Sequence, residues 1–239
     1  MIILPQMRGV VGGFTPLVYA PTLWLDASKT STLWQDTAGT TPVTAAGNPV
    51  ARIDDQSGGG RNMTQSTSSK RPVWGNVTRN GRGGLSFDGV DDNLLGSDTG
   101  LPSGTSDRTA FAVHAYPSLT NNWGGFSYGT TGVANQMFGI VKSDNGAPSQ
   151  KAAVQGWSTD YKTTYTVTAG VVYQHTARLA SGTLTQNIAK VQVFSGASSL
   201  NTVLSSTRLD RSMVGGGLER CHLPRMIMLC IQQSCCGAT

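Results

Sequence analysis

The stretch GRGGLSFDGVDDNLL, residues 81–95, shows the pattern on which the whole chain is built. Within it, Leu85 and Phe87 alternate with small or polar residues, which is the period-two signature of a half-buried strand. The DGVDD segment that follows, residues 88–92, is rich in the glycine and aspartate that favour tight turns. Asn93 and the two leucines after it then resume the sheet. The stretch therefore predicts a strand, a turn and a second strand, with apolar side chains directed into a core.

Similar short segments lie on both sides of this stretch. TLWLD at 22–26 predicts a strand with Leu23 and Leu25 on one face. TAFAVHAY at 109–116 predicts a half-buried strand in which Phe111 and Val113 alternate with polar or small neighbours. IAKVQVFS at 188–195 is the clearest alternation in the chain and predicts a single strand. Many short strands with frequent turn signals favour an antiparallel sandwich or barrel, and no segment has a convincing helical period.

The composition supports an all-β fold. Only 13% of the residues are charged, against about 25% in ordinary globular proteins. Glycine, serine and threonine are abundant, and Glu219 is the single glutamate. Strands and turns favour these residues more than helices do, so a helical bundle and a regular α/β fold are not expected.

Charge and hydropathy argue against two classes of partner. The net charge of +5 is scattered, without the basic run that would predict nucleic-acid binding. No apolar stretch reaches the roughly 20 residues that cross a bilayer. Residues 1–20 lack the charged start and continuous apolar run of a secretion signal, so we expect synthesis in the cytoplasm.

The chain divides into three regions that differ in composition and apolar pattern. Residues 1–21 are apolar but broken by Pro5 and Pro16, and they predict an extended arm that docks on another subunit. Residues 22–232 predict the β-sandwich domain. Residues 233–239 form a cysteine-containing tail. The four cysteines lack the spacing of a structural zinc site and predict free thiols; they are Cys221, Cys230, Cys235 and Cys236.

Several motifs together resemble a known family. LWLDAS (23–28), DQSGGGRNMTQ (55–65), KRPVW (70–74) and FDGVDD (87–92) resemble the laminin-G-like, concanavalin-A-like jelly-roll domains of tailed-phage virion proteins. The match covers residues 22–95 well. The middle of the chain shares only the spacing of short strands and turns. The resemblance implies an antiparallel β-sandwich whose last apolar strand, within PRMIMLCI at 224–231, pairs near the first. It does not fix the function, because one fold hosts many functions.

Two turns carry clustered aspartates. Asp54 and Asp55 precede one glycine turn, and Asp88, Asp91 and Asp92 surround Gly89. Short aspartate side chains cap turns by accepting backbone N–H groups. Clustered carboxylates also suit Ca²⁺, and both turns could converge on one ion. Turn capping is the favoured interpretation, Ca²⁺ binding is the alternative, and no other cofactor is expected.

Aromatic residues in polar, turn-rich contexts are candidates for glycan contact, because exposed rings stack on flat ligands. The candidates are Trp123, Tyr128, Trp157 and Tyr161. The alternative is that each ring closes an end of the core. Trp24, Trp34 and Trp74 lie in or beside strands and are expected to be core residues.

Catalysis is not expected. Glycosidases use two carboxylates flanking the scissile bond, but this chain has one glutamate and no predicted strand with the pattern D-x-D. His114 and His175 lie mid-strand, away from any nucleophile motif, and are expected to make ordinary hydrogen bonds.

The resulting expectation is a homo-oligomeric virion-surface protein of a phage, carried on a fibre, spike or decoration. It would contact other virion proteins through its arm and bind host-surface glycans. The alternatives are a structural protein that clamps neighbouring subunits without binding sugar and, more remotely, a glycan hydrolase.

Overall fold

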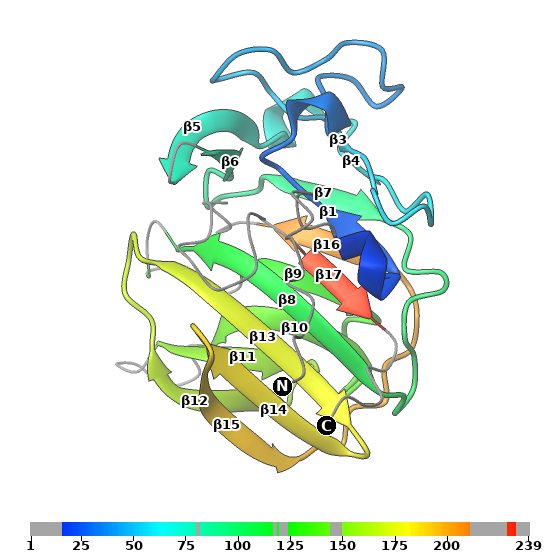
Figure 1. Ribbon diagram of the computed structural model, residues 1–239, viewed down its shortest axis with the longest axis vertical. Helices are drawn as coiled ribbons and strands as arrows, with labels where there is room; N and C mark the ends of the chain where they lie inside the picture. Colours follow the sequence, from blue (N-terminus) through cyan, green and yellow to red (C-terminus); the bar gives the residue numbers. More distant parts are fainter. Residues whose placement is uncertain are drawn as a thin grey trace, which may run out of the picture.

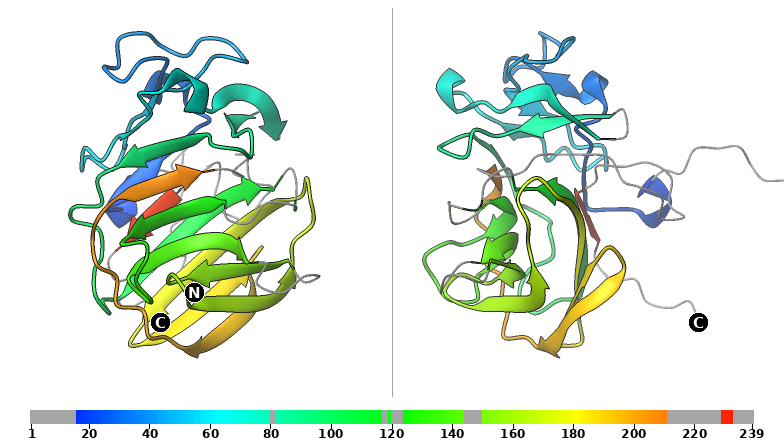
Figure 2. Two further views of the ribbon diagram at one scale, coloured as in Figure 1. Left: turned by 180° about the vertical axis from the view of Figure 1, so that it is seen from behind. Right: turned by 90° about the vertical axis from the view of Figure 1, so that its left-hand side faces the viewer.

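A computed structural model describes residues 16–79, 82–116, 119, 124–143, 150–210 and 229–232. Two antiparallel sheets face each other, and a separate two-stranded hairpin lies at one end (Figures 1 and 2). The fold is therefore the predicted all-β antiparallel sandwich.

The six-stranded sheet has the order β1, β17, β8, β13, β14, β15. Its strands are β1 (Leu23–Leu25), β17 (Leu229–Gln232), β8 (Arg108–Ala115), β13 (Val172–Ala180), β14 (Thr183–Ile188) and β15 (Val191–Ala197).

The nine-stranded sheet has the order β12, β11, β10, β9, β16, β7, β4, β3, β2. Its strands are β12 (Asp160–Thr166), β11 (Lys151–Gln155), β10 (Met137–Ser143), β9 (Gly125–Gly129), β16 (Thr207–Asp210), β7 (Asn93–Gly96), β4 (Met63–Thr64), β3 (Arg52–Ile53) and β2 (Leu33–Trp34).

The remaining elements are short. The hairpin consists of β5 (Val73–Arg79) and β6 (Arg82–Ser86), and Trp74 ties it to the sandwich by donating from Nε1 to Ala27 O at 2.8 Å. Three 3₁₀ turns are η1 (Pro16–Tyr19), η2 (Thr30–Thr32) and η3 (Ser68–Lys70). No helix of the described residues is long and apolar enough to span a membrane.

The core lies between the two sheets and confirms much of the predicted alternation. Leu23 and Leu25 are buried, as are Leu85 and Phe87. The main cluster draws on both sheets, and its members include Leu33, Ile53, Leu94, Phe126, Phe138, Ile140, Val154, Leu179 and Leu184. Burying this apolar surface supplies the main driving force for folding.

The end of the chain closes the sheet next to its first strand. β17 pairs antiparallel with β1, with Leu23 opposite Ile231 and Leu25 opposite Leu229, and on its other side it pairs with β8. The predicted pairing of the last apolar strand near the first is confirmed for residues 229–231.

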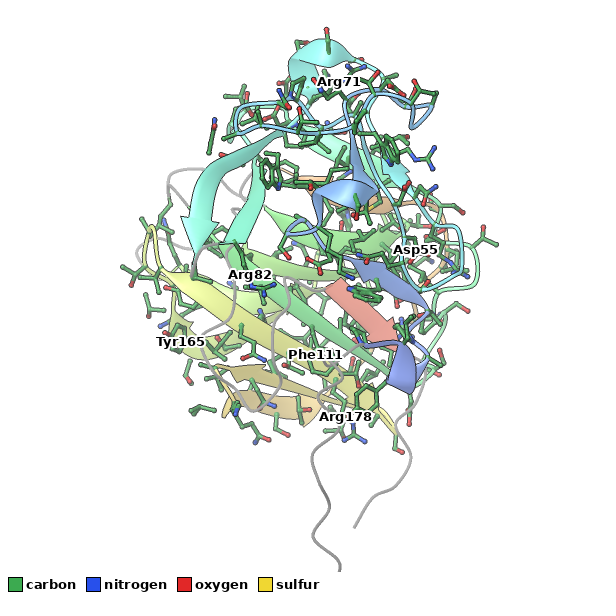
Figure 3. All side chains as sticks on the ribbon, turned by 45° about the horizontal axis from the view of Figure 1, so that its top comes forward. Asp55, Arg71, Arg82, Phe111, Tyr165 and Arg178 are labelled. Carbon is green, nitrogen blue, oxygen red and sulfur yellow. The ribbon has the colours of Figure 1, made fainter. Side chains whose placement is uncertain are left out.

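Two sequence predictions about strands were wrong. β8 is not half-buried as predicted, because every residue of it except Phe111 is buried, and Ala110 and Ala112 supply its contacts to the main core cluster. Phe111 lies on the outward face of the six-stranded sheet, where Figure 3 labels it. The two small alanines allow the sheets to approach closely, whereas hydropathy alone favoured the larger residues.

The predicted single strand at 188–195 is a hairpin. β14 ends at Ile188 and β15 begins at Val191. Between them, Ala189 and Lys190 adopt φ of 48° and 72°, the left-handed values of a two-residue type I′ turn. Neither residue is among the glycine, asparagine and aspartate that usually signal such a turn, so the alternation concealed it.

Candidate functional site

Three connections meet at one end of the nine-stranded sheet. They are residues 130–136 between β9 and β10, residues 156–159 between β11 and β12, and residues 198–203, which lead toward β16. Backbone hydrogen bonds join them: Asn135 N donates to Trp157 O at 3.3 Å, and Asn201 N donates to Asn135 O at 2.8 Å. This group, here called the Trp157 edge, comprises Asn135, Trp157, Ser158, Ser199 and Asn201.

Trp157 sits at the tip of a tight hairpin. Gly156 N donates to Thr159 O at 2.8 Å, and between them Trp157 and Ser158 have φ of 58° and 54°. A bulky residue in the left-handed region is a genuine conformational outlier. The indole is half-buried and Ser158 is exposed.

Hydrogen-bonding side chains lie on the connections that are joined to the Trp157 hairpin. Ser199 Oγ donates to Asn135 Oδ1 at 3.2 Å, and Ser199 also exchanges a hydrogen bond with Tyr161 Oη at 3.0 Å. Ser199 and Asn201 are exposed. The Trp157 edge thus combines a partly exposed ring with amide and hydroxyl groups, the mixture that recognises a polyhydroxylated ligand. The sequence analysis missed Asn135, Ser199 and Asn201 because three distant segments bring them together.

The two tyrosine candidates do not offer a ring to solvent. Tyr128 is 1% exposed, and its hydroxyl accepts from Arg108 and donates to Pro102 O. Burial raises the pKa of the Tyr128 phenol to about 12. Tyr161 is also buried and packs edge-on against Phe194. Both tyrosines were expected to present exposed rings, and the structure buries them instead. Tyr128 shares the inward face of β9 with Phe126. Trp123 lies outside the described residues.

The carboxylates of Asp54 and Asp55 both accept hydrogen bonds from neighbouring protein groups. Asp54 accepts from Trp34 Nε1 at 2.7 Å and pairs with Arg52 Nε at 2.6 Å. Asp55 accepts from the backbone N–H groups of Trp24, Ser57 and Arg61. Asp55 therefore caps its turn and fixes the loop against β1, whereas the contacts of Asp54 are with the side chains of Trp34 and Arg52.

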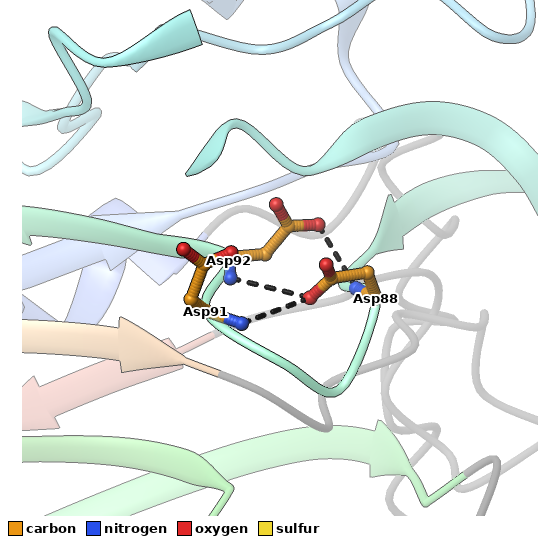
Figure 4. A group of neighbouring side chains, drawn as sticks. All are labelled: Asp88, Asp91 and Asp92. Atoms are coloured by element: carbon orange, nitrogen blue, oxygen red, sulfur yellow. Dashed lines mark hydrogen bonds between the residues drawn. The ribbon is translucent and has the colours of Figure 1, made fainter. Parts of the chain in front are cut away.

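The second aspartate turn holds three carboxylates close together (Figure 4). One oxygen from each of Asp88, Asp91 and Asp92 lies within 4.8 Å of the others. Asp88 Oδ1 accepts from the N–H groups of Val90, Asp91 and Asp92, and Asp92 Oδ2 accepts from Asp88 N. Burial, with repulsion from Asp88 and Asp91, raises the pKa of Asp92. Among the described residues, Asp54 and Asp55 are not part of this cluster, so the expected convergence of the two turns on one ion is not observed.

The two mid-strand histidines are buried rather than surface residues. Gln186 Nε2 donates to Tyr161 O, so its Oε1 faces His175 Nε2 at 3.2 Å and accepts that proton. Among the described residues, the Nδ1 atoms of His175 and His114 have no hydrogen-bond partner. Burial lowers the pKa of His114 to about 3 and of His175 to about 4. Both imidazoles are therefore neutral near pH 7. Among the contacts described, only His175 makes the ordinary side-chain hydrogen bond that was expected of both.

Comparison with known proteins identifies the fold. No protein-family model and no curated protein matches the sequence. Among solved structures, the chain is similar to domain 4 of AbnA, a GH43 extracellular arabinanase from Geobacillus stearothermophilus, determined in complex with arabinotriose. The identity is 16%, the match covers 89% of this chain and 92% of that one, and the TM-score is 0.53.

Two further structures share the architecture. One is a GH54 α-L-arabinofuranosidase soaked with a cyclic sulfate inhibitor, with 14% identity and a TM-score of 0.59. The match covers 89% of this chain and 59% of the enzyme. The other is an arabinofuranosidase complexed with arabinofuranosyl-α-1,2-xylobiose, with 14% identity, a TM-score of 0.55, and coverage of 78% and 47%. The chain is an antiparallel β-sandwich similar to these domains, and at these identities the likeness establishes the fold alone.

Proposed function

We propose that this protein is a non-catalytic glycan-binding module in which Trp157 stacks on a sugar ring. The observation that carries the proposal is the conformation of that residue. Holding a non-glycine residue in the left-handed region costs about 1–2 kcal/mol. A turn selected for stability alone would place asparagine or glycine there.

The other tight hairpins of the described chain make the contrast clear. Their left-handed positions hold Ser181 and Gly182, or Ala189 and Lys190, which are small or flexible residues. Trp157 is the one aromatic residue with positive φ among the described residues. Placing an indole at this tip, beside Asn135 and Ser199, sacrifices stability and gains a partly exposed ring among polar groups.

The wider context supports a sugar ligand and a virion setting. A similar sandwich domain, in the arabinanase, is seen with arabinotriose bound. The motifs of residues 22–95 resemble those of phage virion domains, so we place the protein on a particle surface in a fibre, spike or decoration, anchored to other subunits through residues 1–21. Its ligand there would be a host-surface glycan.

Absence of catalysis is part of the proposal. A glycosidase needs two free carboxylates flanking the bond, whereas Asp54 pairs with Arg52 and the Asp88 carboxylate caps its own turn. Glu219, the single glutamate, lies outside the described residues.

The test is Trp157→Asn, measured with arabinotriose and with a panel of bacterial surface glycans. Asparagine tolerates the left-handed conformation, so the melting temperature should stay within a few degrees of wild type. Glycan affinity should fall at least tenfold, because the stacking surface is removed.

Ser158→Asn is the matched control, since it changes the neighbouring left-handed residue and leaves the indole in place. Its affinity should equal that of wild type. A Trp157→Asn protein that melts far lower but binds glycans normally would show that the ring serves packing, and the proposal would then be wrong.

A further inference from the structure

A separate pocket lies on the outward face of the nine-stranded sheet. Its volume is about 370 Å³, within the range of about 300–1,000 Å³ typical of small-molecule sites. The residues that line it are Gln65, Thr67, Lys70, Asp91, Asp92, Asn93, Leu95 and Arg208. None of them belongs to the Trp157 edge.

Sheet pairing explains how distant residues form this pocket. The floor comes from three adjacent strands, where Leu95 of β7 lies opposite Thr64 of β4 and Arg208 of β16. The chain leaves β4 into the loop at 65–72 and enters β7 from the aspartate turn at 88–92. These two loops form the walls, and η3 places Lys70 on one of them.

Hydrogen bonds fix the walls before any ligand arrives. Gln65 Nε2 donates to Asn93 Oδ1 at 2.7 Å, and Gln65 Oε1 accepts from Thr67 N at 2.9 Å. Asn93 Nδ2 donates to Asp91 O at 2.8 Å. Arg71 clamps the outer loop by donating to the carbonyls of Gln65 and Ser66. A lining held in this way lowers the entropy cost of binding.

The charges in the pocket balance. Lys70 and Arg208 are cationic, Asp91 and Asp92 are carboxylates, and Lys70 Nζ lies 3.7 Å from Asp91 Oδ2. An anionic ligand would meet the two carboxylates, and a cationic ligand would meet the ammonium and guanidinium groups. A neutral ligand would meet neither of these like-charge repulsions.

The donors and acceptors are matched to hydroxyl groups. An ammonium offers three N–H donors and a carboxylate several lone pairs, while each sugar hydroxyl both donates and accepts. Lys70 and Asp91, each with a side chain a little over 40% exposed, could bind adjacent hydroxyls through charge-assisted hydrogen bonds. Leu95, at 39% exposure, offers an apolar floor for the C–H face of a sugar.

We infer that this pocket is a second saccharide site, selective for a neutral sugar unit. The inference rests on the proposed glycan-binding function, adds a second site to it, and assigns the ligand charge from Lys70, Arg208, Asp91 and Asp92. It predicts that two independent sets of residues bind glycans.

The experiment maps sugar binding on the full chain by backbone amide chemical shifts. The probes are neutral methyl glycosides of arabinose, xylose, glucose, galactose and mannose, with glucuronate and glucosamine as charged counterparts. At least one neutral glycoside should shift the amides of 65–70 and 91–95. Its affinity should fall about tenfold or more in Asp91→Asn and in Lys70→Gln, and should be unchanged in Lys190→Gln, which alters an exposed lysine on a distant hairpin.

Three results would overturn the inference: no neutral glycoside shifts these amides, the charged probes bind the pocket more tightly, or both pocket variants keep wild-type affinity. If glycans bind and only Trp157→Asn lowers their affinity, the proposed function stands and the second site is refuted. If the pocket variants alone weaken binding, the pocket stands and the role of Trp157 is refuted.

Discussion

Arg108 is 1% exposed and anchors one end of the core. It donates to the carbonyls of Pro102, Ser106 and Gly104 and to the hydroxyls of Tyr128 and Thr202. Removing the donors leaves buried acceptors unpaired, which is a recognised cause of large destabilisation.

We therefore expect Arg108→Met to lower the free energy of unfolding by about 3 kcal/mol or more, measured by urea denaturation. Arg178→Met, on the exposed face of β13 (Figure 3), is the control and should change it by less than about 0.5 kcal/mol. Equal effects of the two substitutions would contradict this role for Arg108.

The buried histidines make stability depend on pH. Their pKa values, about 3 for His114 and about 4 for His175, lie below the ordinary 6.5, so the unfolded chain binds more protons than the native chain. This contribution is fully present above pH 6.5 and is lost as the pH falls toward 4 and then 3. The free energy of unfolding should decline by up to about 1.4 kcal/mol per pH unit for each histidine.

Denaturant melts between pH 7 and pH 4 measure this decline. His114→Phe removes one of the two imidazoles and should show a shallower slope than wild type. Identical slopes in the two proteins would mean that His114 is not buried in the neutral form.

At the scale of elements, the aspartate turn at 88–92 tests capping against metal binding. Asp88 Oδ1 accepts three backbone N–H groups, so we expect Asp88→Ala to cost about 1–3 kcal/mol. Adding EGTA should leave the melting temperature unchanged. A lower melting temperature in EGTA that Ca²⁺ restores would instead identify a cation site, because a ligand bound only to the native state stabilises it.

Elements also show where sequence reasoning stops. Alternation located the strands around residues 23–25 and 84–87 with the correct inward side chains, because each is decided by a few neighbouring residues. It did not indicate that Ala110 and Ala112 supply the core contacts of β8, since two alanines carry little hydropathy but fit between closely packed sheets. It also missed the turn at Ala189 and Lys190, whose backbone conformation is imposed by the pairing of β14 with β15.

At the scale of the whole molecule, both candidate surfaces depend on long-range pairing. Trp157 could be proposed from its polar surroundings, but its companions Asn135 and Ser199 come from other hairpins. The pocket joins Gln65 to Arg208 through the pairing of β4, β7 and β16. Tyr128 and Tyr161 were misplaced because the sandwich buries them on its inner face. Sequence therefore predicted the fold, whereas Trp157 stays a candidate and its polar neighbours could be found only from the topology.

The central claim is that the intact sandwich binds glycans without cleaving them. Incubating the full chain with arabinotriose and a panel of bacterial surface glycans, and following both binding and product release, tests it most directly. The account predicts saturable binding to at least one neutral glycan, with the glycan recovered unchanged. A folded protein that binds none of them, or that releases shortened glycans, would contradict it.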